Sequence, residues 1–407
     1  MQTTGVDLKN PDLYRDGVPH EVFSRLRREA PVAWNPEADG RGFWAVTRYD
    51  DIVAVSKNPQ VFSSDRKHGG HRIFDENEVG VAGLGVDQTE APMISMDPPE
   101  HNQYRRRVST GFTPQRMRGL EGRIRDRVSA ILDRLNGREH CDFVTDIAAE
   151  LPIQVLAELL GVPQADRGNL FAWSNALIAE DDPEYRASPA AVAQKIANMV
   201  EYALRLWQDR IDHPGDDLIS MLVHSRIAGE AMTRERYVGA FILMIAAGNE
   251  TTRNAIAAGF LALAEYPEAK RRLIADLALL PLAAAEIVRW VSPVLHMRPT
   301  AIADAVIGDQ PVRRGDKVIL WYCSANRDES IFTDPFRFDV GRSGPPQLGF
   351  GAGQHYCLGV HLAELQIRIL YEEFLRRYPN AQPEGPLRRV RSNFVVGYKS
   401  IPIRLYS

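Results

Sequence analysis

Cysteine is scarce in this chain, which carries only Cys141, Cys323 and Cys357 among its 407 residues. So small and odd a number argues against a disulfide framework and favours a reducing compartment. Long apolar runs are also missing, because the most lipid-like stretch, residues 241–247, is far shorter than the ~18 residues that a membrane-spanning helix needs. The first ten residues are polar and lack the apolar centre of a signal peptide. The sequence therefore predicts a cytoplasmic protein with no contact to a membrane.

An excess of either charge is missing as well. The chain has 49 Lys and Arg against 53 Asp and Glu, which gives a net charge of −4. Its basic residues are scattered, except for the run Arg105-Arg106-Arg107. A nucleic-acid-binding protein usually concentrates basic residues on one face, so no nucleic acid is expected as a partner. Hydrophobic residues make up 44% of the sequence, which permits a core of substantial size.

Hydrophobic periodicity predicts a mainly α protein with a minor β region. From about residue 100 to 292 the apolar residues recur at helical spacing, and a further helix is expected at 358–378. Strand-like runs, rich in β-branched and aromatic residues, occur at about 30–65, 294–325 and 385–407. Neither a flexible linker nor an internal repeat separates these parts. We therefore expect a single domain over residues 1–407.

The pattern also predicts individual elements. The expected helices span residues 20–30, 117–135, 145–160, 190–212 and 235–264. The expected strands span residues 32–34, 43–47, 300–307, 317–321, 393–396 and 401–405. Residues 64–99 show no period and are rich in Gly, His, Asp and Pro. A structureless segment of this length is usually functional, and we expect residues 68–96 to form a lid over a pocket.

A glycine-studded loop at 350–359 carries the main chemical signal. It reads Phe-Gly-Ala-Gly-Gln-His-Tyr-Cys-Leu-Gly and places Cys357 directly before a predicted helix. Glycines allow unusual backbone conformations and close approach of other groups. The N-terminus of a helix favours a thiolate, which is a strong metal ligand. A buried, inert thiol is the alternative reading for any cysteine; it fits Cys141 and Cys323 but leaves the glycines around Cys357 unexplained.

This loop resembles the haem-binding signature of the cytochrome P450 family, and the resemblance extends over essentially the whole chain. It implies the cytochrome P450 fold and a haem b cofactor with Cys357 as the proximal iron ligand. A thiolate ligand donates electron density to the iron and promotes cleavage of the O–O bond. The match includes Phe350, which is implied to pack near the macrocycle, and Gly359 after the cysteine.

Glu286 and Arg289 lie three residues apart on a predicted helix and therefore share a face. By itself this spacing is common and would indicate an exposed pair of little energetic value. Its position upstream of the cysteine loop resembles the E-x-x-R motif of the family, which implies a buried structural ion pair. Arg337 is the expected third member. Gln347 stands where many relatives have a histidine, so the composition of this network stays open.

Four side chains match the family's ligands for the haem propionates. His101 and Arg105 begin a predicted helix, and Arg298 and His355 match the other two positions. Carboxylates need charge-assisted donors, and arginine can offer two at once. For Arg106 and Arg107, exposure on a helix turn is the preferred interpretation.

Polar residues interrupt the long helix predicted at 235–264, in the segment Ala247-Gly248-Asn249-Glu250-Thr251-Thr252. A hydroxyl inside a helix can bond back to the preceding turn, and a solvent-facing turn would also explain the pattern. The resemblance implies instead an acid–alcohol pair beside the oxygen-binding site. Thr251 would hold dioxygen and an ordered water, and Glu250 would renew protons from solvent.

The resemblance implies a monooxygenase that inserts one oxygen atom from dioxygen into a C–H bond of a hydrophobic molecule. Its electrons would come from a separate ferredoxin or flavodoxin and an NAD(P)H-dependent reductase, and the chain would act as a monomer. Two alternatives remain: a peroxide-driven haem-thiolate oxidase and a non-catalytic haem protein that senses gas. The acid–alcohol pair argues against both, since neither requires proton delivery.

The expected substrate pocket combines the lid with three apolar segments. Its predicted members are Met244, Ile245, Val294, Leu295, Met297, Val395 and Val396. Asn249 and His296 could orient a polar substrate group, although core or surface roles fit them equally well. Segments 43–47, 247–254 and 392–394 resemble bacterial members that act on terpenes, steroid side chains and alkyl lipids, so these substrate types are favoured.

Overall fold

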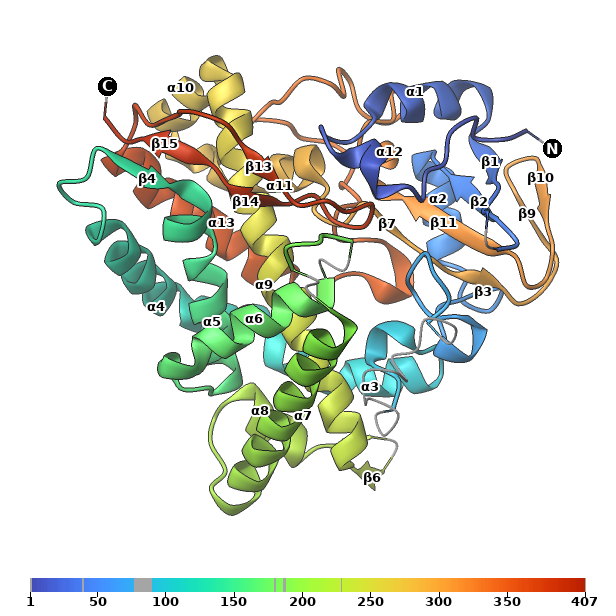
Figure 1. Cartoon of the computed structure of the whole chain (residues 1–407), viewed down its shortest axis with the longest axis horizontal. Coiled ribbons are helices and arrows are strands. Elements are labelled where there is room, and N and C mark those ends of the chain that lie inside the picture. The colour runs from blue at the N-terminus through green and yellow to red at the C-terminus, as the bar shows by residue number, and fades with distance from the viewer. Residues whose placement is uncertain are drawn as a thin grey trace.

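The computed structural model describes residues 2–38, 40–76, 90–178, 181–185, 188–227 and 229–406. The described chain has a larger helical part and a smaller part built on β-sheet (Figure 1). This agrees with the mainly α class predicted from the sequence. Among the described residues, none of the helices combines the length and the apolar character that crossing a bilayer requires.

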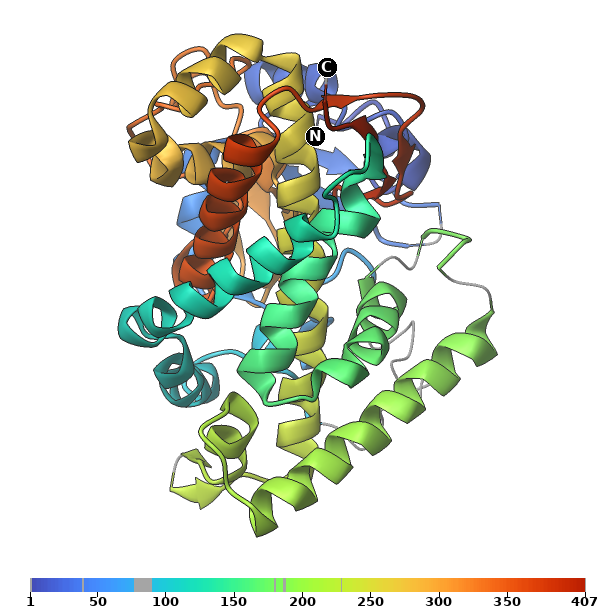
Figure 2. The same ribbon diagram turned by 90° about the vertical axis from the view of Figure 1, so that its left-hand side faces the viewer.

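The long helix α9 (Arg234–Glu265) runs through the middle of the helical part (Figures 1 and 2). Thr233 caps its start, because the threonine side chain accepts a hydrogen bond from the backbone N–H of Arg236. Helices α5 (Glu150–Leu160), α6 (Arg167–Ile178) and α11 (Leu280–Val291) are among those that pack against α9. A helix enclosed in this way is expected to be apolar around most of its circumference. Its buried polar residues therefore need a specific explanation.

Helix α13 (Val360–Arg377) follows the cysteine loop and packs against α9 through aromatic rings. The ring of Phe143 lies 4.3 Å from that of Phe260 on α9 and 5.2 Å from that of Phe374 on α13, measured between centroids. The hydroxyl of Tyr371 also donates to the carbonyl of Ile256 across the two helices. These contacts fix the cysteine loop relative to the polar turn of α9.

The remaining helices surround this centre. They are α1 (His20–Glu29), α2 (Tyr49–Ser56), α3 (Glu100–Val108), α4 (Pro114–Asp133), α7 (Pro189–Asp212), α8 (Leu218–Val223), α10 (Pro267–Ala275) and α12 (Tyr322–Ala325). Helix α7 lies across the outside of the helical part (Figure 2).

The main sheet has six strands and joins the N-terminal part of the chain to the part that follows α11. Its order is β1–β2–β11–β8–β3, and β7 also pairs with β11. The strands are β1 (Val32–Asn35), β2 (Phe43–Val46), β3 (Phe62–Ser63), β7 (His296–Met297), β8 (Thr300–Ala301) and β11 (Lys317–Trp321). Strands β2 and β11 run parallel, with Ile319 opposite Ala45. Both are almost continuously apolar because both faces of this part of the sheet are covered.

Smaller β elements complete the fold. Strand β15 (Pro402–Arg404) lies between β4 (His140–Asp142) and β12 (Gln382–Pro383), and β13 (Arg388–Arg389) pairs with β14 (Tyr398–Ser400). Two further hairpins join β9 (Ala305–Ile307) to β10 (Gln310–Val312) and β5 (Arg226–Ile227) to β6 (Glu230–Ala231).

Several predicted elements need correction. Strands β4, β5 and β6 interrupt the stretch predicted as overwhelmingly helical. Each pairs with a segment that is too short or too distant in sequence to leave a periodic signal. The helix predicted at 145–160 is divided into a π-helical turn, Phe143–Ala148, and α5. The strand predicted at 300–307 is two strands, β8 and β9. The segment predicted at 393–396 makes only an isolated bridge between Val395 and Val294.

Candidate active site

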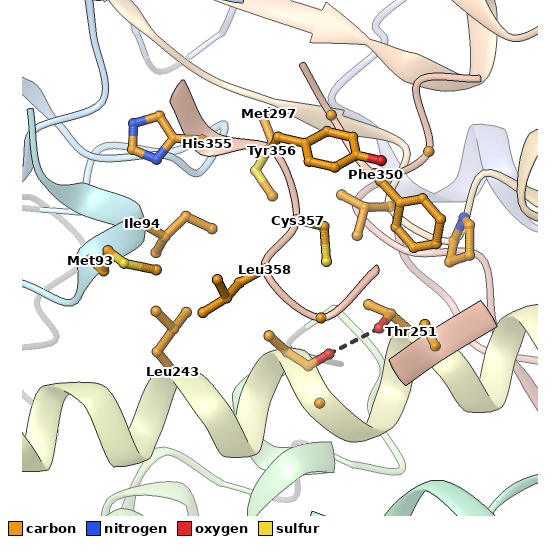
Figure 3. A pocket seen from close by; sticks show the side chains of 18 of the residues that line it. Met93, Ile94, Leu243, Thr251, Met297, Phe350, His355, Tyr356, Cys357 and Leu358 are labelled. Carbon is orange, nitrogen blue, oxygen red and sulfur yellow. Dashed lines mark hydrogen bonds between the residues drawn. The ribbon is translucent and has the colours of Figure 1, made fainter. Parts of the chain in front are cut away.

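A largely apolar cavity of about 310 Å³ lies between α9 and the cysteine loop. Met93 and Ile94 approach it from the segment predicted as a lid, and Leu243 and Met244 line it from α9 (Figure 3). Cys357 lines the opposite side, and its sulfur is directed toward α9 in Figure 3. Described parts of the predicted lid thus reach the cavity, while its residues 77–89 lie outside the described residues.

The cysteine loop is closed by its own backbone. The N–H of Cys357 donates to the carbonyl of Phe350 at 2.9 Å, and Phe350 lines the cavity beside the sulfur. Gly353 has φ +64°, and a Cβ on this residue would lie 2.1 Å from the carbonyl oxygen of Ser56. Only glycine permits both this conformation and so close an approach. The glycines therefore hold the loop against α2 and present Cys357 to the cavity.

The electrostatic environment of Cys357 differs from the expectation. Burial raises the pKa of the Cys357 thiol, while the backbone N–H of Gly359 and the charge of Arg105 oppose this rise. The cysteine precedes the first residue of α13, Val360, by three positions, so the helix dipole acts on it only weakly. Metal binding deprotonates a thiol, and the Gly359 N–H and Arg105 are placed to stabilise the resulting thiolate.

Three of the four predicted propionate ligands meet at one end of the cavity. His101, Arg105 and His355 all line it, and the two imidazole rings lie 4.4 Å apart. The Nε2 atoms of both histidines are buried without a hydrogen-bond partner among the described residues. Unpaired buried donors beside a guanidinium suit the carboxylates of an anionic ligand. Together with the cavity-facing sulfur, this donor set fits a haem.

Arg298 is not among the described residues that line the cavity. Its guanidinium donates to the carbonyl oxygens of Gly69 and Phe74, at 3.0 and 2.8 Å, and lies near Asp75. The arginine is 3% exposed, and its donors hold the segment that leads into the predicted lid. Its role at the propionates stays a prediction, because the other bonds of Arg298 leave its Nε without a hydrogen-bond partner among the described residues.

The predicted acid and alcohol on α9 point in different directions. Thr251 lines the cavity, and its hydroxyl donates to the carbonyl of Ala247 at 2.9 Å (Figure 3). This confirms the expected bond to the preceding turn. Glu250 is fully buried, is not among the cavity-lining residues, and forms an ion pair with Arg253 on its own helix. The sequence pattern did not indicate that the acid would already be paired.

Glu286 and Arg289 form a buried ion pair on α11, with hydrogen bonds of 2.6 and 2.8 Å. Arg289 also donates to the carbonyl of Asn326 at 2.7 Å. The third member is Arg342, whose Nε lies 3.1 Å from Glu286 Oε2. Arg337 contributes only its backbone carbonyl, because its side chain is exposed.

Gln347 is separate from this ion pair. Its side-chain oxygen accepts a hydrogen bond from the backbone N–H of Gly349, two residues along the chain. The network around Glu286 is therefore completed by Arg342 and by backbone groups, and the replacement of a histidine by Gln347 does not leave Glu286 without partners.

Three of the seven predicted pocket residues line the cavity, namely Met244, Val294 and Met297. The others, Ile245, Leu295, Val395 and Val396, are not among its described lining residues. Their side chains belong to hydrophobic clusters behind the wall. Successive helical residues are rotated by about 100°, and successive extended residues face opposite sides. The neighbours of Met244 and Val294 therefore point into the core.

Asn249 and His296 are also absent from the described cavity lining. Asn249 is buried on α9, and the ring of His296 packs against Trp321 and Phe394 at 4.7 and 5.4 Å. Burial lowers the pKa of His296 to about 3. Of the roles left open for these two residues, the structure favours the core.

Sequence reasoning missed several site residues. His71 lines the cavity and forms an ion pair with Glu76 at 2.7 Å, and Thr252 lines the cavity beside Thr251. Arg253 pairs with Glu250, and Arg342 pairs with Glu286. The spacing of Glu250 and Arg253 was a readable signal, since it repeats that of Glu286 and Arg289. Nothing local marked Arg342 or His71.

Comparison with known proteins places this architecture in one family. The family model for cytochrome P450 matches residues 152–404. Linalool 8-monooxygenase of Pseudomonas putida is 45% identical over 98% of this chain and 98% of its own length. The methyl-branched lipid omega-hydroxylase of Mycobacterium tuberculosis is 38% identical over 96% of this chain and 91% of its own length.

Solved structures agree in fold over nearly the whole chain. A cytochrome P450 of Mycobacterium marinum, solved in complex with pseudoionone, has a TM-score of 0.91 and 36% identity and covers 99% of both chains. A cytochrome P450 of Novosphingobium aromaticivorans has a TM-score of 0.88 and 36% identity over 98% of both chains. With its cavity-facing cysteine, buried Glu286–Arg289 pair and these relatives, the chain belongs to the cytochrome P450 family.

Proposed function

We propose that this chain is a bacterial haem b monooxygenase that hydroxylates an acyclic terpenoid or a similarly branched alkyl compound, with Cys357 as the iron ligand. The monooxygenase class and the hydrophobic substrate follow from the family and its named relatives. The observation that supports the site is the cavity, which combines an apolar wall, a single directed sulfur and a polar end. Steroid C26-monooxygenase, 35% identical, makes a steroid side chain the second candidate substrate.

Haem, when bound, supplies the reductive activation of dioxygen and the oxidation of the C–H bond. The chain's residues bind and orient. Cys357 would hold the iron from one side, and His101, Arg105 and His355 would hold the propionates. Met244, Val294 and Met297 would exclude water and orient the apolar substrate. Thr251 lies on the side of the cavity opposite the sulfur of Cys357. Its hydroxyl would hold a proton by hydrogen bonding near the place where dioxygen is activated.

The redox partners and the oligomeric state are also part of the proposal. Electrons would come from a separate ferredoxin or flavodoxin with an NAD(P)H-dependent reductase. Residues 1–407 would act as one catalytic domain and as a monomer. A cytoplasmic location stays a prediction from the sequence.

The test is oxidation of linalool by the haem-loaded protein with a surrogate ferredoxin, its reductase and NADH, followed by mass spectrometry of the product. We expect a hydroxylated product that depends on all components. Cys357→Ser is the control, and it should lose both the product and the thiolate-type absorption band of the carbon-monoxide complex.

Other outcomes would identify the alternatives. Product formed only with added hydrogen peroxide would indicate the peroxide-driven oxidase. Carbon-monoxide binding without oxidation of terpenoids, steroids or fatty acids would favour a gas sensor. A substrate-induced shift of the haem absorption band, compared for linalool, testosterone and palmitic acid, ranks the substrate classes, and linalool should bind tightest.

A further inference from the structure

The segment predicted as a lid brings an imidazole to the apolar cavity. His71 lines the cavity, and its side chain is 19% exposed. Met93 and Ile94, which approach the cavity from the same predicted lid, offer it only carbon and a thioether sulfur (Figure 3). In a largely apolar pocket, the few polar groups fix the orientation of the ligand. His71 is therefore a candidate for contact with a polar group of the substrate.

The ring of His71 is held on one side by two buried side chains. Its Nδ1 lies 2.7 Å from Oε1 of Glu76 and 2.8 Å from the hydroxyl oxygen of Ser95. Glu76 is 6% exposed and Ser95 is 0% exposed. Because Nδ1 is turned toward these groups, the second ring nitrogen, Nε2, lies on the side of the ring that is left for the cavity.

The backbone around His71 is shaped to hold the carboxylate of Glu76. Gly70 has φ +79°, and a Cβ on this residue would overlap the carboxyl group of Glu76, so only glycine fits there. Oε1 of Glu76 accepts a hydrogen bond from the backbone N–H of His71 at 2.8 Å. The backbone N–H of Arg298, between β7 and β8, donates to the carbonyl of His71 at 3.0 Å. The turn that carries the imidazole is thus fixed to the main sheet and to Glu76.

The position of the proton on this pair determines what Nε2 can bind. Burial favours a higher pKa for Glu76, but the charge of His71 and its hydrogen bonds lower the pKa to about 2. Near neutral pH Glu76 is therefore an ionised carboxylate, which only accepts, and Nδ1 of His71 carries the proton between them. Nε2 is then an acceptor in the neutral imidazole and a donor in the charged one.

A hydroxyl group is the ligand that matches Nε2 in both of these states. It donates as well as accepts, so it bonds to the imidazole whether the ring is neutral or charged. A ketone or an ether only accepts, and it therefore bonds to the charged ring alone. A hydrocarbon does neither and would displace water from Nε2 without replacing its hydrogen bond, which is unfavourable. The pair formed by His71 and Glu76 therefore favours an alcohol.

A haem propionate is the alternative partner of His71, because the charge of His71 acts on His355 at the polar end of the cavity. The surrounding charges argue against it. Arg105 supplies a positive charge beside His355, whereas Glu76 supplies a negative charge beside His71. A second carboxylate near Glu76 would be repelled by it. The propionates are therefore better placed at Arg105 and His355 than at His71.

We propose that His71 binds the hydroxyl group of an aliphatic alcohol, and that Glu76 and Ser95 position its ring for this contact. The inference rests on the proposed monooxygenase function and narrows its substrate class, since an alcohol such as linalool is preferred to the hydrocarbon with the same skeleton. The hydroxyl fixes one point of the molecule at the predicted lid, and the apolar wall holds the rest. Loss of the bond should therefore also give a wider mixture of hydroxylated products.

The experiment measures binding to the haem-loaded protein through the substrate-induced shift of the haem absorption band, so it needs no turnover. Two pairs of probes are compared. Linalool is paired with dihydromyrcene, which has the same carbon skeleton and no hydroxyl, and dodecanol is paired with dodecane. The quantity of interest is the Kd of the hydrocarbon divided by the Kd of the alcohol. Comparing this ratio between variants isolates the bond to the hydroxyl, because the apolar contacts cancel.

His71→Leu removes both ring nitrogens and keeps a side chain of similar size. We expect the ratio to fall about tenfold in this variant, the value of one hydrogen bond in a buried site. His71→Gln can both donate and accept, and it should recover part of the preference for the alcohol. His68→Leu is the matched control, because His68 lies three residues earlier and is not among the described residues that line the cavity. It should keep the wild-type ratio.

Glu76→Gln tests the positioning role of the carboxylate. The amide has the same size, but it no longer requires the proton to be on Nδ1 of His71. The ratio should therefore fall about threefold, with haem content and Tm at neutral pH close to those of His68→Leu. An unchanged ratio would contradict the role of Glu76. A wild-type ratio in His71→Leu for both probe pairs, or the failure of both alcohols to bind, would overturn the proposal as a whole.

A crystal structure of the haem-bound protein with linalool gives a second readout. The hydroxyl oxygen of linalool should lie within hydrogen-bond distance of Nε2 of His71. A propionate oxygen in that place would overturn the proposal.

Binding and turnover separate this inference from the proposed function. A preference for alcohols that depends on His71, without any oxidised product, would support the hydroxyl site and contradict the proposed monooxygenase. Hydroxylated linalool with the same binding ratio in the wild type and in His71→Leu would support the monooxygenase and contradict the hydroxyl site.

Discussion

The two buried glutamate–arginine pairs share a spacing and differ in everything around them. On α11, both carboxylate oxygens of Glu286 are bonded, and Arg289 reaches backbone carbonyls and Glu286. On α9, one oxygen of Glu250 and one nitrogen of Arg253 have no partner among the described residues. The same three-residue step along a helix thus produces a completed network in one place and an incomplete one in the other.

The difference follows from what each pair packs against. The Glu286 pair faces the irregular segment that leads to the cysteine loop, where free backbone groups and Arg342 supply partners. The Glu250 pair faces another regular helix, α6, whose backbone groups are already used within the helix. Partly satisfied buried charges are costly, and such groups are frequent at functional sites, which is consistent with the acid role proposed for Glu250.

Glu286→Ala should have the largest effect. The change leaves Arg289 as a buried charge with no acid partner, and breaking such a pair costs about 3–5 kcal/mol. We expect mostly insoluble or haem-free protein, measured as the ratio of haem absorbance to total protein after purification. Normal yield and haem content would contradict the structural role of this network.

Glu250→Gln should spare the fold and damage the reaction. The amide keeps the size of the side chain and can still accept from Arg253 and Asn254, but it cannot carry a proton. We expect kcat for linalool to fall about 100-fold, with wild-type haem content. If the variant were instead mostly insoluble or haem-free, as expected for Glu286→Ala, the two ion pairs would not differ in role.

Thr251→Ala tests the proposed role of the hydroxyl that lines the cavity next to Glu250. Removing the hydroxyl should leave NADH consumption nearly unchanged and lower product per NADH about 100-fold, with hydrogen peroxide as the other product. Peroxide and hydroxylated product are measured in the same reaction. Thr252→Ala is the matched comparison, and equal uncoupling in both would show that the two hydroxyls are interchangeable.

Arg342→Leu sharpens the account of the completed network. The change removes one of the two cations at Glu286 and should lower the free energy of unfolding by about 1–3 kcal/mol. Arg337→Leu is the control on the same segment, and its exposed side chain should matter by less than about 0.5 kcal/mol. Denaturant titration gives the free energy of unfolding of both variants. A larger loss in Arg337→Leu than in Arg342→Leu would make Arg337 the third member of the Glu286–Arg289 network.

A third buried carboxylate, Glu76, is paired with a histidine instead of an arginine. We expect the change Glu76→Gln to have the smallest effect. Burial favours a higher pKa for Glu76, but the charge of His71 and hydrogen bonds from His71 outweigh it and lower the pKa to about 2. While His71 is protonated, this pair contributes stability above the unfolded pKa of Glu76 near 4.5, and the contribution is lost as pH falls toward about 2. Between pH 6 and pH 4 the loss is about 1 kcal/mol. Glu76→Gln should remove this part of the pH dependence of Tm.

The helices and central strands were predictable because their signals are local. The period of apolar residues located α9 and α13 within a few residues, and β11 matches its predicted span. Strand β4 was not predictable, because its three residues gain strand character only by pairing with β15. Asp142 caps the π-helical turn that precedes α5, whereas α5 itself begins after Ala149 with no side-chain cap, so apolar periodicity could not locate the break between them.

The candidate site also contains residues that were predictable from the sequence and residues that were not. Cys357 and Thr251 were found because a motif fixes their local geometry, and both line the cavity. Arg337 was wrongly predicted as the third member of the Glu286 network. A long side chain can reach any of several distant partners, and sequence spacing does not record which one it reaches. Ile245 and Leu295 were predicted to line the cavity but lie in the core. Each follows a residue that does line the cavity and therefore points in a different direction. Direction at a cavity wall is set by tertiary packing.

Strand β15 has a consequence for how the molecule is made. It covers the edge of β4, with Ile403 opposite Cys141, so two segments from distant parts of the chain must meet before either is complete. A ribosome makes the β4 region long before β15. Until then β4 offers an unpaired edge, the kind of surface that promotes aggregation. Slow translation between these segments should therefore lower the yield of folded protein, and chaperones should matter most in that interval.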